Sequence, residues 1–235
     1  MKKKELKEKL AGKFIVFDGP DGSGKSTQIK LLADYLEEYN IPVVDTQDPG
    51  GTKIGDQIRR LLKYDAKGKM DAATETFLFM ASRAQLVNEV VKPSKESGKV
   101  VLCDRYITAT CAYQGAAGYA TGKIIELGKY AVGDCWPELT VILDIDPDKG
   151  RERTGHQKKQ RTKNDHKDAH QGFLFENVSV DRFDSRTLDY HRKVRKEFLK
   201  LSMYYPTKVV FLDVSNGDIE EIHEKIKELI IETEF

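Results

Sequence analysis

The stretch Phe14–Thr27, which reads FIVFDGPDGSGKST, decides the fold. Its apolar first residues lead into Gly19-x-x-x-x-Gly24-Lys25-Ser26, and a helix-compatible run follows. A glycine loop between a buried strand and a helix is the setting of a phosphate-binding P-loop. The glycines let backbone N–H groups surround a phosphate, and the helix N-terminus adds partial positive charge. The stretch therefore predicts nucleoside triphosphate binding by Gly19, Pro20, Asp21, Gly22, Ser23, Gly24, Lys25, Ser26 and Thr27.

Candidate metal and phosphate ligands lie in and near this loop. In a P-loop the lysine reaches the β- and γ-phosphates and the next hydroxyl binds Mg²⁺, which assigns these roles to Lys25 and Ser26. The apolar run 99–104 ends in Asp104, like a Walker B strand whose carboxylate lies near the metal. Arg105 follows directly. A structural charge pair is one interpretation of Arg105, but its place beside a P-loop favours phosphate binding.

Composition limits the partners and the compartment. The chain has 235 residues, enough for one α/β domain, and 39 basic against 38 acidic residues give a net charge of +1. Such a balance provides no general attraction to nucleic acid or to an anionic membrane, so neither is expected as a partner. The three cysteines lack metal-ligand spacing, which is typical of reduced thiols and predicts a cytoplasmic protein.

The N-terminus is basic and has no apolar core long enough for a signal peptide, and no run in the chain is long enough to span a bilayer. We expect 1–12 to be a frayed basic leader, with a nucleic-acid-binding arm as the alternative, and 13–235 to be a single domain.

Apolar runs and helical patterns alternate along the chain. This alternation predicts an α/β fold with a five-stranded parallel sheet covered by helices on both faces. The expected strands are 14–17, 41–44, 99–104, 137–144 and 208–214. The expected helices are 26–39, 54–62, 71–96, 123–132, one that begins at Pro147 and carries Arg151 and Arg153, 181–201 and 219–231. The small polar segment 107–118 suits a pocket wall.

The predicted helix 71–96 has two faces of interest. Its buried stripe is expected to contain Phe77, Met80, Ala81, Ala84 and Val87. Phe79 and Arg83 are four residues apart and share another face, where a ring and a guanidinium are suited to stacking on a base and bonding its carbonyl edge. The spacing alone favours the plainer interpretation, in which Phe79 is core and Arg83 is surface.

Two polar segments leave alternatives open. The turn-rich loop 47–52 follows a predicted strand, and it is either a connection or a wall of the ligand site. The basic tract 154–171 has no periodicity and predicts a partly disordered loop or lid, either solvated or binding a partner. Its histidines, His156, His166 and His170, do not form a compact metal signature and are expected to be solvated.

Several classes of P-loop protein fit less well than a small kinase. A GTPase needs Asn-Lys-x-Asp for guanine, and the chain offers only 162–165, Thr-Lys-Asn-Asp, in the wrong order. A nucleic-acid motor is normally longer and needs a basic track. A small kinase needs a second binding site facing the P-loop and a lid with arginines, and the chain has candidates for both. Another nucleotide or deoxynucleoside kinase and a non-enzymatic P-loop switch remain alternatives.

A series of motifs resembles the thymidylate kinases and covers the chain from Phe14 to its C-terminus. In order, the motifs are Gly19–Thr27, Asp48–Thr52, Phe79-x-x-x-Arg83, Asp104-Arg105-Tyr106 with Ala112–Gly115, and Asp181–Asp184. The resemblance implies a nucleoside monophosphate kinase fold with a mobile lid and insertion at about 151–184. It also implies in-line phosphoryl transfer from ATP to dTMP with Mg²⁺, and a homodimer.

The resemblance implies a role for each matching residue. Asp21 contacts the 3′-hydroxyl of the acceptor sugar, and Arg105 holds the acceptor phosphate. Phe79 stacks on thymine while Arg83 bonds its carbonyl edge, and Thr110 approaches the base. Tyr113 crowds the 2′ position. Asp48 and Gln114 belong to the same substrate pocket. Since position 22 is glycine, the catalytic arginine is expected from the lid, with Arg153 and Arg182 as candidates.

Three features depart from the pattern of this family. Gln47 stands where an arginine is usual, and Ala109 replaces a usual serine. The lid is longer than typical, with the extra residues within about 154–180.

Overall fold

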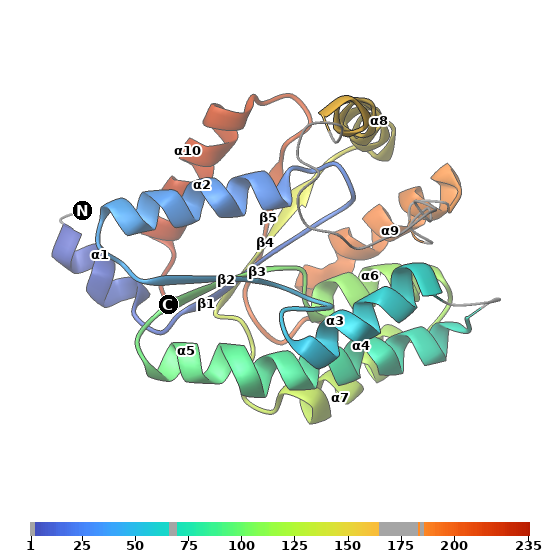
Figure 1. Cartoon of the computed structure of the whole chain (residues 1–235), viewed down its shortest axis with the longest axis horizontal. Helices are drawn as coiled ribbons and strands as arrows, with labels where there is room; N and C mark the ends of the chain where they lie inside the picture. Colours follow the sequence, from blue (N-terminus) through green and yellow to red (C-terminus); the bar gives the residue numbers. More distant parts are fainter. Residues whose placement is uncertain (1–2, 66–69, 165–182, 184–185) are drawn as a thin grey trace.

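The chain folds around one parallel sheet. The computed structural model describes residues 3–65, 70–164, 183 and 186–235. Its strands follow the order β2-β3-β1-β4-β5 and pair in parallel throughout (Figure 1). They are β1 Phe14–Asp18, β2 Val43–Gln47, β3 Val100–Asp104, β4 Leu139–Asp144 and β5 Val209–Asp213. The predicted five-stranded α/β fold is thereby confirmed.

Helices cover both faces of the sheet, and each face has its own apolar core. One face carries α1 Lys3–Leu10, α2 Lys25–Glu38 and α10 Ile219–Glu232 (Figure 1). The other carries α3 Lys53–Arg60, α4 Ala72–Leu86, α5 Lys92–Glu96, α6 Ile107–Ala116, α7 Thr121–Val132 and α9 Leu188–Lys200. Two π-helical turns, η1 Leu61–Asp65 and η2 Val87–Val91, continue α3 and α4, and η3 Leu201–Met203 continues α9.

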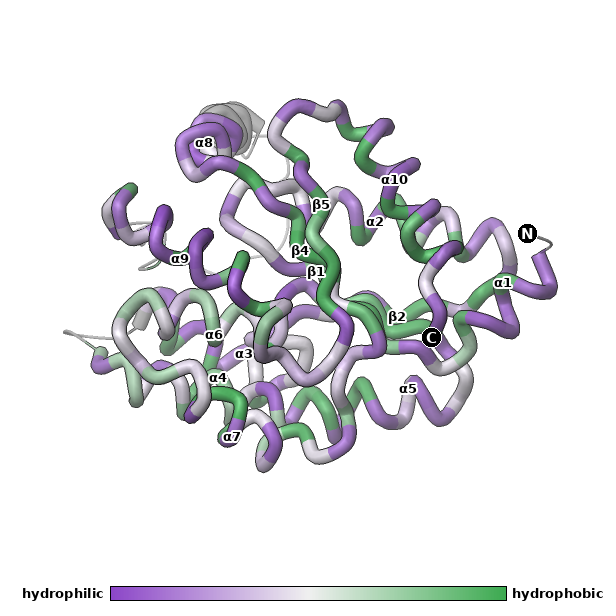
Figure 2. The backbone as a smooth tube through the Cα atoms, turned by 180° about the vertical axis from the view of Figure 1, so that it is seen from behind, coloured by the Kyte–Doolittle hydropathy of each residue, from purple (hydrophilic) through white to green (hydrophobic). Residues whose placement is uncertain are grey.

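The central strand shows why the apolar run forms this sheet. All five residues of β1 are buried, because α2 covers one face of the strand and α6 and its neighbours cover the other. Figure 2 shows the resulting hydrophobic line along β1, β4 and β5, with α8 and α9 mainly hydrophilic and the other helices of mixed character. The register places Asp104 opposite Phe17 on one side and opposite Gln47 on the other. The polar strand ends therefore meet at one edge, where a ligand site is expected.

The N-terminal segment differs from the expected frayed leader. Residues 3–10 form α1, whose Leu6 and Leu10 are buried in the core beneath α2 and α10. The Lys9 Nζ also donates to the carbonyl oxygen of Ile231 at 2.6 Å. The prediction was wrong here because two leucines four residues apart give even a strongly charged helix an apolar stripe.

Other corrections concern helices. Segment 107–118, expected as a pocket wall without a helical pattern, begins with α6, which is buried on most sides and so lacks an amphipathic pattern. In α4, Phe77 is 57% exposed and Ala81 is exposed, contrary to the predicted stripe. The helix α8 Pro147–Asn164 extends into the tract expected as a loop. The remainder of the expected lid, with His166 and His170, lies outside the described residues, as does the side chain of His156.

All three cysteines are free and buried, which agrees with the expectation of reduced thiols. Burial raises the pKa of each thiol, to about 12 for Cys111. Across the described part of the chain, none of the helices has both the length and the apolar character that crossing a bilayer requires.

Candidate active site

The P-loop connects the end of β1 to the start of α2. Gly19 and Gly22 have φ of 133° and 80°, which L side chains rarely adopt. A β-carbon at Gly22 would collide with the carbonyl oxygen of Gly150, and one at Gly19 would collide with that of Leu143. The glycines therefore let the loop lie directly against β4 and the first turn of α8.

Lys25 is buried beneath this loop. Its Nζ donates to the carbonyl oxygens of Gly19 at 3.1 Å and Pro20 at 3.0 Å. Burial lowers the pKa of Lys25, and the nearby Arg105 lowers it further, although three carboxylates oppose these effects. A buried ammonium that is held only by carbonyl and hydroxyl dipoles in the described structure is well placed to exchange them for phosphate oxygens.

Ser26 and Asp104 meet where α2 begins and β3 ends. The Ser26 hydroxyl donates to Asp104 Oδ2 at 2.7 Å. Beside the pair lies a cavity of about 410 Å³, which Asp45 and Gln47 also line. Hydroxyl and carboxylate oxygens next to a phosphate loop are the donors that Mg²⁺ prefers, so the residues present fit this metal. The described residues contain no cluster of three or more His, Cys, Asp or Glu side chains suited to bind a metal without a substrate.

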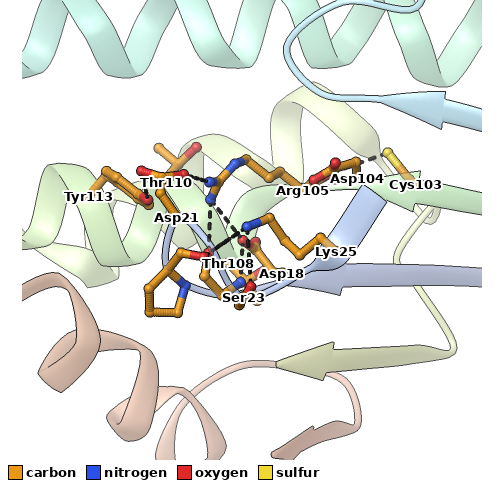
Figure 3. A network of polar contacts seen from close by, with 12 residues as sticks. Asp18, Asp21, Ser23, Lys25, Cys103, Asp104, Arg105, Thr108, Thr110 and Tyr113 are labelled. Carbon is orange, nitrogen blue, oxygen red and sulfur yellow. Dashed lines mark hydrogen bonds and ion pairs between the residues drawn. The ribbon is translucent and has the colours of Figure 1, made fainter. Parts of the chain in front are cut away.

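Arg105 is the centre of a polar network at the end of β3 (Figure 3). Its guanidinium contacts the carboxylate of Asp21, Asp18 Oδ1 at 3.3 Å and the carbonyl oxygen of Gly19 at 3.1 Å. The guanidinium also lies 5.1 Å from the centre of the Tyr113 ring. The Tyr113 hydroxyl in turn donates to Asp21 Oδ2 at 3.0 Å. Asp21, Arg105 and Tyr113, predicted from separate motifs, therefore form one cluster.

The backbone and charge of Arg105 are unusual. Its φ is 73°, a conformation that costs a non-glycine residue about 1–2 kcal/mol and that clusters at functional sites. Burial by itself would lower the pKa of Arg105, but Tyr113, Asp21 and Asp18 raise it far above its usual range. Arg105 is thus a permanent cation whose guanidinium lies against the P-loop at Gly19 and Asp21.

Asp18 is a member of this network that motif reasoning missed. Its carboxylate is fully buried and accepts from the Thr108 hydroxyl at 2.6 Å, from Gly19 N at 2.9 Å and from Arg105. Burial raises its pKa despite these partners, whereas the pKa of Asp21 is lowered because Arg105, Lys25 and Tyr113 together outweigh its burial. The sequence signal that could have identified Asp18 is its position, as a carboxylate at the end of a fully apolar strand. Asp18 orients Arg105.

A second polar group lies between α4 and α6. Arg83 is 1% exposed, so the interpretation of this residue as surface was wrong. Its Nε contacts Asp48 Oδ2 at 2.5 Å, and its Nη2 donates to the Thr110 hydroxyl at 3.1 Å. Burial raises the pKa of Asp48, while Arg83 opposes the rise. Three predicted substrate residues therefore meet through one guanidinium.

Aromatic rings continue from this group toward the P-loop. Phe79 is partly buried, with its ring centre 6.0 Å from that of Phe183. Tyr113 packs against the same phenylalanine at 6.2 Å and against Tyr190 at 6.5 Å. Apolar ring faces near Arg83 suit contact with a nucleobase.

The remaining predicted residues are placed differently. Gln114 is fully buried on α6, and its amide donates to Glu75, which sequence reasoning missed. Arg153 donates from α8 to the carbonyl oxygen of Val214 at 3.0 Å and has no contact with the Arg105 network. Arg182 lies outside the described residues.

Comparison with known proteins gives a consistent result. A family model described as Thymidylate kinase matches residues 17–226. The chain is 40% identical over 214 residues to a thymidylate kinase of Syntrophotalea carbinolica, covering 91% of this chain and 92% of that protein. Relatives of the same name from Symbiobacterium thermophilum and Clostridium novyi are 37% and 36% identical, and the matches cover 93% and 92% of this chain and 92% and 97% of theirs.

Proposed function

The chain belongs to the thymidylate kinase family, and on this premise we propose how its residues transfer a phosphoryl group from ATP to dTMP to give dTDP. The enzyme is a dTMP kinase. The observation that supports these residue roles is the position of Arg105. It contacts the P-loop at Gly19 and, on its other side, the ring of Tyr113, which packs against Phe183 beside Phe79.

The P-loop residues bind the phosphates of ATP. Lys25 exchanges its loop carbonyls for β- and γ-phosphate oxygens. Ser26 and, through water, Asp104 would hold Mg²⁺, which supplies positive charge to the transferring group when bound. Arg153 and Arg182 are our candidates for the lid arginines. Arg153 follows Gly150 by one turn of α8, and Gly150 packs against the P-loop at Asp21.

The acceptor dTMP lies between Arg105 and α4. Its phosphate oxygen is already ionised at neutral pH, so the reaction needs no general base. Arg105 holds that phosphate in line with the γ-phosphoryl group, and Asp21 turns to the 3′-hydroxyl. Tyr113 crowds the 2′ position. Thymine stacks on Phe79, with Arg83 at a carbonyl oxygen, Thr110 close by and Asp48 holding Arg83 in place.

The direct test is ADP release against a panel of nucleoside monophosphates, with Mg²⁺ and with excess chelator. We expect turnover with dTMP, loss of turnover without the metal, and little ADP release without an acceptor. Preference for another monophosphate would indicate a different nucleotide kinase. Triphosphate binding with no acceptor-dependent turnover would indicate a switch.

Replacement of Arg83 by alanine tests base recognition. The expected result is a rise of about 10- to 100-fold in KM for dTMP with a small change for ATP, because a charge-assisted hydrogen bond to the base is lost. The same replacement leaves Asp48 buried without its cation, so Arg83→Ala combined with Asp48→Asn serves as the folding control. Equal weakening of both substrates in the double variant would assign Arg83 to folding.

We further propose a homodimer built on α3, η1 and α4. Large apolar side chains are exposed on these contacting elements: Ile54, Leu61, Tyr64 and Phe77. Light scattering of Phe77→Lys is expected to show a monomer where the wild type is a dimer, because a buried lysine opposes the contact. Met203→Lys, at an 82% exposed residue on η3, is the matched control. A monomeric wild type would contradict the proposal.

A single domain that includes α1 as well as 13–235, the lid at about 151–184 and a cytoplasmic location complete the proposal. Three buried free thiols support a reducing compartment.

A further inference from the structure

Two polar contacts, which we call rungs, join α4 to α6. Their residues are one helical turn apart on α6 and two helical turns apart on α4. Arg83 donates to Thr110 at 3.1 Å, and Gln114 Nε2 donates to Glu75 Oε2 at 2.9 Å. On α4, Glu75, Phe79 and Arg83 are spaced by four residues, so Phe79 lies between the two rungs. The base stacked on Phe79 in the proposed function therefore has Arg83 toward one side and Gln114 toward the other.

The chemistry of the Glu75–Gln114 rung fixes the orientation of the amide. An ionised carboxylate only accepts hydrogen bonds, so Gln114 must present its NH₂ group to Glu75. The amide oxygen of Gln114 then points away from Glu75. Both residues are buried, and no donor among the described residues reaches that oxygen. A buried acceptor without a donor is energetically costly, and a base bound in the proposed function would supply one.

Arg186 is a second partner of the Glu75 carboxylate. Its Nη2 lies 3.0 Å from Glu75 Oε1, as an ion pair in which Glu75 is 1% exposed and Arg186 is 23% exposed. The guanidinium also lies 4.5 Å from the centre of the Tyr190 ring and 5.1 Å from that of Phe183. Arg186 thus holds the Glu75 carboxylate in an ion pair and connects it to the aromatic rings.

We propose that Glu75 is a positioning residue that sets base specificity by fixing the amide of Gln114 with its oxygen toward the base. This inference rests on the proposed function. A thymine or uracil ring carries N3–H, which donates to that oxygen. A cytosine ring has a lone pair at N3, which the same oxygen repels. The residue pair therefore selects an imide base, and it acts independently of the contact at Arg83.

Glu75→Gln tests this assignment, because a neutral amide at position 75 donates as well as accepts and so permits Gln114 to turn over. The substrates are dUMP and dCMP, which differ only at N3 and at the C4 substituent, and Arg83 is unchanged in the comparison. We expect the ratio of kcat/KM for dUMP over dCMP to fall about tenfold or more, with KM for ATP unchanged. Glu89→Gln is the matched control, because Glu89 accepts from Gln85 in the same kind of contact at an exposed site.

A double-mutant cycle separates positioning from a structural role. If Glu75 acts through Gln114, then Glu75→Gln changes the ratio in the wild-type background and leaves it unchanged in Gln114→Ala. A full effect in the Gln114→Ala background, or a ratio equal to that of Glu89→Gln, overturns the inference. If Glu75→Gln does not fold, Arg186→Gln is measured in its place, and an unchanged ratio there overturns it as well. Absence of dTDP formation by the wild type would instead refute the proposed function, and this inference with it.

Discussion

Replacement of Arg105 by alanine is expected to lower kcat/KM for dTMP by about 10³-fold while ATP binding stays near the wild-type value. In the proposed function Arg105 provides the cation that aligns the acceptor phosphate, and its guanidinium already contacts Asp18, Asp21 and Tyr113. Steady-state kinetics with each substrate varied, together with equilibrium binding of an ATP analogue, measures both effects.

Two variants make the Arg105 result interpretable. Arg105→Gly removes the same side chain but adopts the φ of 73° without strain, so agreement between the glycine and alanine variants assigns the loss to the guanidinium. Arg192→Ala removes a guanidinium that is 52% exposed, and it is expected to keep normal turnover. Near-normal activity and KM in Arg105→Ala would show that the acceptor phosphate binds elsewhere.

Replacement of Lys25 by alanine is expected to reduce kcat by about 10³-fold or more, because no other cation in the described P-loop replaces it at the β- and γ-phosphates. The protein is expected to remain folded. The lost hydrogen bonds go to loop carbonyls, and a buried charge with a lowered pKa is removed at the same time.

Thermal unfolding and single-turnover formation of dTDP measure the two parts of the Lys25 prediction. Lys30→Ala, an exposed lysine on the same helix, is the control. A Lys25→Ala variant that is folded and as fast as Lys30→Ala would contradict the assigned role.

The sheet was predictable because its three inner strands, β1, β3 and β4, are buried almost throughout and read as apolar runs between glycine-rich or polar breaks. The P-loop motif then placed the candidate site at the carboxyl ends of β1 and β3. Helix α6 was missed for a related reason. It is enclosed by α4, α7 and α9, so its small and polar residues show no apolar stripe. Phe77 was assigned to the core by spacing alone, but spacing does not identify which side of a helix meets a neighbour.

In the candidate site, only the residues that belong to recognisable sequence motifs were predictable. Asp21, Arg105 and Tyr113 came from separate motifs, and the fold brings them together. Asp18, Glu75 and Arg186 were not foreseen, because their roles come from side-chain contacts between segments up to 111 residues apart. The spacing pattern favoured a surface position for Arg83. Its buried partner Asp48 lies 35 residues earlier in the chain, so the pattern of the helix does not reveal the ion pair.

The burial of every thiol has a practical consequence for following the enzyme at work. Cys103, Cys111 and Cys135 are the chain's whole set of cysteines, and all three are enclosed and held in the unreactive protonated form. A cysteine introduced in place of the 84% exposed Tyr130 would therefore react with a maleimide dye while the native thiols stay unlabelled. Fluorescent reporters can be attached at chosen surface positions without first building a cysteine-free protein.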